Sequence, residues 1–200
     1  MYKLHNYFLL AAIGLAAVSF TSCSKDDPVP EIDQEEYDGT ILTFTEGHYH
    51  GEEFHAAGDT LQIRFVKGSD KAYPSHVHLH EGEQYQLDIA MFKNGENISA
   101  EFGESEHQWF FLGSPDGVLD YTYSDNQVGF KGVFTVNQAT PEGFDLQLIL
   151  RHGLDKSQAA AQDWNSNNYR EAGGSDDFNK SFELHPVEGD HDHEEGHEHD

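Results

Sequence analysis

The sequence predicts an all-β fold, a single antiparallel β-sandwich of the immunoglobulin-like, Greek-key type. Two observations support this prediction. Apolar and polar residues alternate with a period of two in segment after segment, as at Leu61, Ile63 and Phe65 with polar residues between them, so that each segment has one buried and one wet face. Turn-forming residues separate these segments at short intervals, which is typical of a sandwich. A body of about 150 residues suffices for one hydrophobic core.

We expect the sandwich to occupy residues 39–187 as one domain of eight main strands. Two short segments, 97–106 and 158–162, are the only candidates for helical turns. Trp109 and its aromatic neighbours are expected in the core. The expected strands are Thr40–Thr45, Thr60–Val66, Gln84–Phe92, Gln108–Leu112, Val118–Ser124, Gly129–Val136, Phe144–Arg151 and Phe178–Leu184.

The N-terminus has the features of a bacterial lipoprotein precursor. Lys3 precedes an apolar run from Tyr7 to Val18, and small or polar residues lead to Cys23, a pattern that predicts a secretory signal peptide over residues 1–22. The apolar run is too short to cross a membrane, which needs about 20 apolar residues. The residues before Cys23 resemble a lipobox, which implies cleavage before Cys23 and a thiol that carries a lipid such as palmitate.

Residues 23–38 predict an extended, charged linker between the lipid and the sandwich, because they contain Pro28, Pro30 and an acidic run. Residues 24–27 resemble the short export signal of surface lipoproteins in the Bacteroidota. The expected location is therefore the outer membrane, with the protein anchored by lipid and exposed on the cell surface. Display on the periplasmic side is the alternative.

The charge balance and the single cysteine exclude several functions. The chain has 37 acidic and 11 basic residues and a formal net charge of −26, which repels phosphate backbones and argues against nucleic acid as a partner. With Cys23 lipidated, neither a disulfide nor a cysteine-based zinc site is available. No Gly-x-Ser-x-Gly elbow of a serine hydrolase occurs.

Histidine is the most distinctive residue of the chain, with 14 copies that mostly alternate beside carboxylates. Imidazole and carboxylate groups suit zinc, copper or nickel. Residues 76–80 place three imidazoles on one face of a strand, and residues 48–55 repeat the chemistry in a glycine-flanked loop. The two clusters could share one zinc ion if their strands are neighbours; alternatively, the rings only fill a wet face. The predicted ligands in the body are His48, His50, His55, His76, His78, His80 and Glu81.

The last segment, residues 188–200, contains no apolar side chain, so we expect it to be disordered without a ligand. We interpret it as a weak, fast-exchanging collector of metal, with a solubilising acidic tail as the alternative. A His-Glu-x-x-His spelling occurs here, but Gly196 and the nearby chain end provide no helix for a zincin site. The predicted ligands of the tail are His191, His193, His197 and His199.

Several motifs follow one another in the body: Glu106-His107-Gln108 with aromatic residues, a Leu-x-Tyr-x-Tyr-x-Asp strand, a Leu-Arg-His strand ending at His152, and a last strand over residues 178–184. This order resembles an uncharacterised family of Bacteroidota lipoproteins, over about residues 39–186. The resemblance implies a small β-sandwich and a TonB-dependent receptor as a possible partner, but no activity. The histidine clusters depart from the family pattern, and function is expected there.

His107 and His152 lie within the motifs that carry the resemblance. We therefore interpret them as structural histidines with satisfied hydrogen bonds at strand ends and leave them out of the predicted metal site. His185, just beyond the last expected strand, stays open.

These patterns predict a binding protein and not an enzyme. It would capture or store a transition metal, zinc first with copper or nickel as alternatives, or deliver the metal to an outer-membrane receptor. A second hypothesis is a cupin-like metalloenzyme, because His76, His78 and Glu83 match part of the first cupin motif, although the second motif is missing. A third is a structural, receptor-associated lipoprotein without a role in metal transport.

Overall fold

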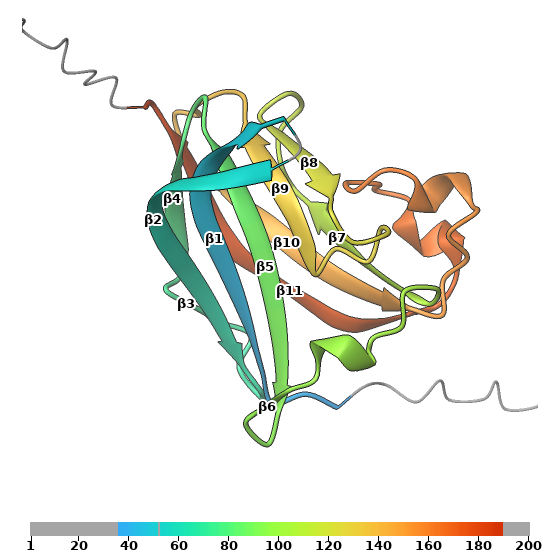
Figure 1. Cartoon of the computed structure of the whole chain (residues 1–200). Helices are drawn as coiled ribbons and strands as arrows, with labels where there is room; N and C mark the ends of the chain where they lie inside the picture. The colour runs from blue at the N-terminus through green and yellow to red at the C-terminus, as the bar shows by residue number, and fades with distance from the viewer. Residues whose placement is uncertain (1–35, 52, 190–200) are drawn as a thin grey trace, which may run out of the picture. The chain divides into compact units, whose positions relative to one another are not determined.

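The computed structural model describes residues 36–51 and 53–189, and these residues form two packed β-sheets (Figure 1). The all-β sandwich predicted from the sequence is confirmed. The predicted signal peptide, the predicted lipidation site Cys23 and most of the linker lie outside the described residues, as do the tail histidines His191, His193, His197 and His199. Within the described ranges, no helix is long and apolar enough to cross a membrane.

The larger sheet contains seven strands of the described chain, and each pairs antiparallel with its neighbours. Its main path runs in the order β3-β2-β1-β5-β9-β8, with β6 beside β5. The strands are β1 (Gly39–His50), β2 (Glu53–Val66), β3 (Ala72–Tyr73), β5 (Gln84–Lys93), β6 (Glu96–Asn97), β8 (Leu119–Tyr123) and β9 (Lys131–Val136).

The hairpin of β1 and β2 is longer than predicted. Residues 48–55 were expected in a loop, but residues 48–50 and 53–55 continue the two strands, with His48 opposite His55 in the register. A register shift at Gly47 precedes this extension, and a Cβ atom on Gly47 would lie 2.2 Å from the carbonyl oxygen of His55. Glycine therefore permits the close approach that carries the hairpin on to its turn at Gly51.

The smaller sheet runs in the order β4-β11-β10-β7. Its strands are β4 (His76–His80), β7 (His107–Leu112), β10 (Phe144–His152) and β11 (Ser175–Val187). β10 pairs antiparallel with both β7 and β11, whereas β4 pairs parallel with β11. This parallel pair departs from the purely antiparallel sandwich that the sequence predicts, and it brings two distant parts of the chain side by side.

The main core lies between the two sheets and includes the expected aromatic residues, with Trp109, Phe111 and Tyr121 all buried. A second, smaller core covers the outer face of β7 and β10. There, residues 153–174 with the 3₁₀ helices η2 (Ala159–Ala161) and η3 (Tyr169–Ala172) pack against Phe110 and Ile149. β7 and the part of β10 that pairs with it are thus covered on both faces. This explains why all six residues of β7 are buried.

Two of the three 3₁₀ helices lie in the segments expected to form helical turns: η1 (Ser99–Glu101) and η2. The helix η3 was not expected. It stands at the end of the covering segment, directly before β11. The start of β7, the end of β10 and the start of β11 therefore meet at one end of the smaller sheet.

Candidate metal centre

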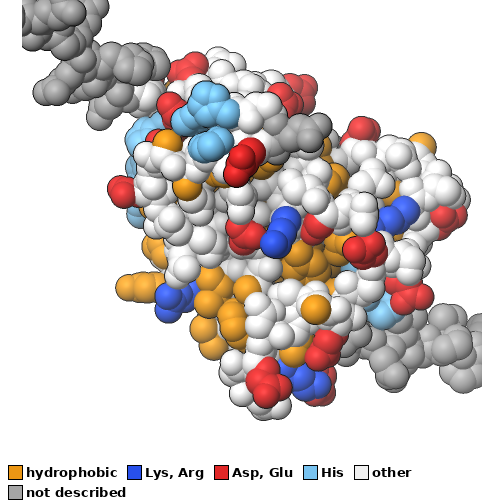
Figure 2. Space-filling view, viewed as in Figure 1, with side chains coloured by type: hydrophobic (Ala, Val, Ile, Leu, Met, Phe, Trp, Pro, Cys, Tyr) orange, Lys and Arg blue, Asp and Glu red, His pale blue; other side chains and the backbone are white. Residues whose placement is uncertain are grey.

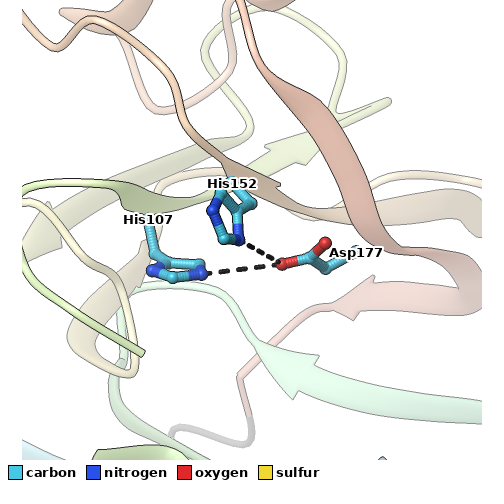
Figure 3. Close-up of side chains that lie close together, drawn as sticks. All are labelled: His107, His152 and Asp177. Carbon is cyan, nitrogen blue, oxygen red and sulfur yellow. Dashed lines mark ion pairs between the residues drawn. The ribbon is translucent and has the colours of Figure 1, made fainter. Parts of the chain in front are cut away.

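Three metal-ligating side chains converge at this end of the smaller sheet. His107 opens β7 and His152 closes β10, and the two are directly opposite in the register. Asp177 comes from β11, on the other side of β10. Both imidazole rings face the carboxylate of Asp177 (Figure 3). We call His107, His152 and Asp177 the buried triad.

A β-bulge puts Asp177 in place. The register of β10 and β11 pairs Leu150 with Phe178 but Arg151 with Asp176, so Asp177 is an extra residue without a partner in the ladder. Bulges re-aim the side chains beside them. The two consecutive aspartates accordingly have different contacts, because Asp176 pairs with Arg151 while Asp177 faces the two histidines.

Arg151 anchors the chain around this bulge. Its guanidinium is 6% exposed and donates hydrogen bonds to the carbonyl oxygens of Gly173 and Gly174 and to Oδ1 of Asp176. Charge-assisted bonds from a planar guanidinium are strong and directional. The backbone that leads into Asp177 is therefore fixed from the neighbouring strand.

The triad is buried, and its inward-facing atoms make no hydrogen bonds. The side chains of His107, His152 and Asp177 are 3%, 17% and 0% exposed. Nε2 of His107, Nδ1 of His152 and both carboxylate oxygens of Asp177 have no hydrogen-bond partner. A buried carboxylate without a partner is costly unless a cation neutralises it. A positive charge shared by the two imidazoles and the carboxylate would therefore stabilise the site.

The distances within the triad suit a shared ion better than a direct contact. Oδ2 of Asp177 lies 3.6 Å from Nε2 of His107 and 3.5 Å from Nδ1 of His152, within the range of an ion pair but beyond the usual 2.7–3.2 Å of an N–H···O hydrogen bond. Two ligand atoms held at 2.0–2.2 Å by one tetrahedral zinc ion are about 3.4 Å apart. The two distances from Oδ2 of Asp177 match that geometry, and all three donor atoms lie within 4.8 Å of one another.

The second nitrogen of His107 fixes which tautomer faces the site. Nδ1 of His107 lies 3.2 Å from the carbonyl oxygen of Gly103, so in the neutral ring the proton belongs on Nδ1 and the lone pair of Nε2 points at Asp177. Metal-bound histidines commonly donate their other N–H to a backbone carbonyl in this way. The ring of Phe102 packs edge-on against His107, with centroids 5.2 Å apart, and limits its rotation.

Tyr37 lies near the triad, and the side of the triad at His152 is the most accessible to solvent. Burial and the negative charge of Asp177 raise the pKa of Tyr37, which packs on Phe178. His152 is the most exposed of the three ligands, so an ion would reach the site beside its ring. Two imidazoles and one carboxylate are a donor set for zinc and related transition metals, with a fourth position left for water or another ligand.

The predicted body ligands lie apart from the buried triad, at the surface. Figure 2 shows histidine side chains gathered at the upper left, over the ends of β1, β2 and β4. His48, His50 and His55 lie together on the β1–β2 hairpin, with ring centroids 4.8–6.3 Å apart. Within residues 36–51 and 53–189, the buried triad is the one group of three metal-ligating side chains whose donor atoms all lie within 4.8 Å of one another.

The residues of the second predicted cluster, 76–81, lie in different surroundings. His76 and His78 face outward while Val77 and Leu79 are buried, as the alternation predicts. His80 instead has Nδ1 3.6 Å from Oε2 of Glu46 and 3.4 Å from the hydroxyl of Tyr85. Glu81 lies in the turn that follows, where its backbone N–H donates to the carbonyl of Val187.

The hypothesis that both clusters share one ion requires neighbouring strands, and β4 is not hydrogen-bonded to β1 or β2. β4 belongs to the smaller sheet and pairs with β11, whereas β1 and β2 pair in the larger sheet. His185, which the sequence left open, lies opposite His78 through this pairing.

The interpretation of His107 and His152 as histidines with satisfied hydrogen bonds is wrong, because the nitrogen that each turns toward Asp177 has no hydrogen-bond partner. Sequence reasoning missed Asp177 entirely. One weak signal was present: both histidines stand at the end of an expected strand, where side chains of adjacent antiparallel strands meet. The bulge that aims Asp177 leaves no mark in the alternation of the sequence.

No protein-family model, no curated protein and no solved structure matches this chain. The site must therefore be interpreted from its own geometry.

Proposed function

We propose that this protein is a transition-metal-binding lipoprotein of the outer membrane, with zinc as the first choice of metal and the buried triad as its defined site. The observation that carries the proposal is the convergence of three donor atoms from three strands, each buried and without a hydrogen-bond partner. Their 3.5–3.6 Å separations support co-ligands of one ion. Copper and nickel suit the same imidazole and carboxylate donors and are the alternatives.

The role that fits this chemistry is binding without catalysis, for capture, storage or delivery to an outer-membrane receptor. The exposed histidines on the β1–β2 hairpin and on β4 would collect metal at low affinity. The buried triad would then retain it more tightly, because its ligands are held in position before the ion arrives. A lipid on Cys23 would keep the protein at the membrane beside its receptor.

The test is the effect of zinc on unfolding of the full chain purified without a histidine-affinity step. An ion bound only by the folded chain, at a free concentration 100-fold above its Kd, stabilises that chain by about 2.7 kcal/mol. We expect zinc to raise the Tm of the wild type and to have much less effect on Asp177→Asn. Asp145→Asn, an exposed change on β10, is the matched control and should respond like the wild type.

An equal zinc response in Asp177→Asn and the wild type would remove the triad from the metal site. Metal analysis of the same preparations identifies the ion: zinc at one equivalent or more in the wild type, and less in Asp177→Asn, is the expected result. For the cellular role, loss of the gene should slow growth under zinc chelation. Normal growth there would contradict a role in metal acquisition. Cys23→Ser should release the protein from the membrane fraction.

A further inference from the structure

The parallel pairing of β4 with β11 creates a second group of histidines on the outer face of the sandwich edge. In the register, His76 lies opposite Glu183 and His78 lies opposite His185. The residues between them, such as Val77 and Leu184, are buried in the core. The four polar side chains therefore share one outward face, and we call them the edge patch.

The ring centroids of the three imidazoles of the edge patch are spaced like those of rings that bind one ion. The ring centroids of His76, His78 and His185 are 5.4, 5.6 and 5.0 Å apart, pair by pair. Imidazoles bound at 2.0–2.1 Å to one tetrahedral zinc ion have ring centroids about 5 Å apart. The donor atoms of these rings are not all within 4.8 Å of one another, so binding one ion requires the rings to turn. Rings at the surface of a strand turn about χ1 and χ2 at little cost.

In His185 and His76, a polar neighbour contacts one ring nitrogen and leaves the other available to bind a metal. Nε2 of His185 lies 2.9 Å from Oε1 of Glu183, so its Nδ1 is the free donor atom in the neutral ring. Oγ of Ser75 lies 3.4 Å from Nδ1 of His76, which leaves Nε2. A carboxylate that accepts the second N–H of a ligating histidine fixes its ring and raises its basicity. Glu183 is thus a positioning residue.

His80 is excluded from this group although it lies on the same strand. His76, His78 and His80 all line a cavity between β4 and the larger sheet, but only His80 has its Nδ1 near Glu46 and Tyr85. The opposite position on β11 is Val187, which offers no ligand atom. His80 therefore provides a matched control for each member of the edge patch.

We infer that His76, His78 and His185 form a second transition-metal site, open to solvent and positioned by Glu183. It shares no residue with the buried triad. The inference extends the proposed function, since the two sites would bind the same class of metal. It depends on a different set of side chains.

The test is a residue-resolved footprint of histidine modification by diethyl pyrocarbonate, read by mass spectrometry on the full chain as zinc is added. We expect His76, His78 and His185 to become protected together at one zinc concentration. In His185→Gln, the zinc midpoint for protection of His76 and His78 should rise at least about tenfold, because one of three ligands is lost. In His80→Gln that midpoint should not change.

An unchanged midpoint for His76 and His78 in His185→Gln would overturn the site, as would protection of His185 at a different zinc concentration from the other two. The buried triad is read separately in the same preparations, by the zinc-dependent rise in Tm that Asp177→Asn should reduce, because the reagent reaches its rings poorly. Loss of protection at the edge patch with that rise unchanged, or the converse, therefore separates failure of the edge patch from failure of the proposed function.

Discussion

The buried triad and the edge patch bring similar side chains together in opposite surroundings. In the triad, a bulge and a backbone carbonyl hold the ligands, and the inward atoms have no hydrogen-bond partner. In the edge patch, the rings of His76 and His78 are exposed to water and free to turn. The difference shows that a high density of histidine in a sequence marks a wet surface, whereas a preorganised site can use isolated histidines far apart in the chain.

If the triad depends on its support, removing Arg151 should destabilise the protein and loosen the triad while leaving the edge patch intact. Arg151→Met removes the closer of the two guanidinium groups that pair with Asp176, the other being that of Arg170, and breaks bonds to two backbone carbonyls. Breaking a buried ion pair typically costs 3–5 kcal/mol; because Asp176 is partly exposed, we expect about 3 kcal/mol of unfolding free energy by urea denaturation.

The matched control for this change is Arg64→Met on the larger sheet. Arg64 is exposed and donates to Gln62, so its removal should change the unfolding free energy by less than about 1 kcal/mol. The footprint of His76 and His78 with zinc should stay as in the wild type in both variants. Similar losses of stability in the two variants would show that the bulge has no special anchor.

A glycine beside each group gives a second comparison. Gly174 has φ of 75°, and an added Cβ atom would lie 2.0 Å from the carbonyl oxygen of His152. Gly82, after β4, has φ of 85° but open space around it. We expect Gly174→Ala to cost about 2 kcal/mol or more and Gly82→Ala about 1 kcal/mol, since only the first adds a clash to the backbone strain.

Thermal unfolding with and without zinc measures the stability of each glycine variant and its response to zinc. Displacement of the His152 carbonyl should also reduce the zinc-dependent rise in Tm of Gly174→Ala, because it moves a ligand of the triad. An equal rise in Gly174→Ala and Gly82→Ala would mean that the end of β10 tolerates movement without loss of the metal site.

The fold could be predicted from the sequence because alternation is a local property. All eight expected strands occur, and Trp109 and its aromatic neighbours lie in the core. The site could not be predicted, because it depends on strand order and on one extra residue. Nothing local places β11 between β10 and β4, and this order brings His185 to His78 and Asp177 to His152.

The loop expected over residues 48–55 was wrong for a related reason, although His48, His50 and His55 do lie together. The flanking glycines suggested a loop, yet Gly47 serves the close packing of two continuing strands. Glycine in a sequence indicates either a turn or a close approach, and only the pairing of the strands distinguishes the two.

The smallest expected effect concerns the residue that positions the edge patch. Glu183→Gln keeps a hydrogen-bond acceptor near His185 but removes the negative charge that makes the imidazole a better ligand. We expect the zinc midpoint for protection of His76, His78 and His185 to rise about tenfold or less, a smaller rise than in His185→Gln.

The triad should be unaffected, because Glu183 lies on the outward face of β11 opposite His76 and is not among the triad's contacts. A midpoint equal to that of the wild type would show that the 2.9 Å contact between Glu183 and His185 is a surface ion pair without influence on the metal. A change in the part of the zinc-dependent rise in Tm that Asp177→Asn removes would mean that the triad and the edge patch are coupled through β11, the strand that they share.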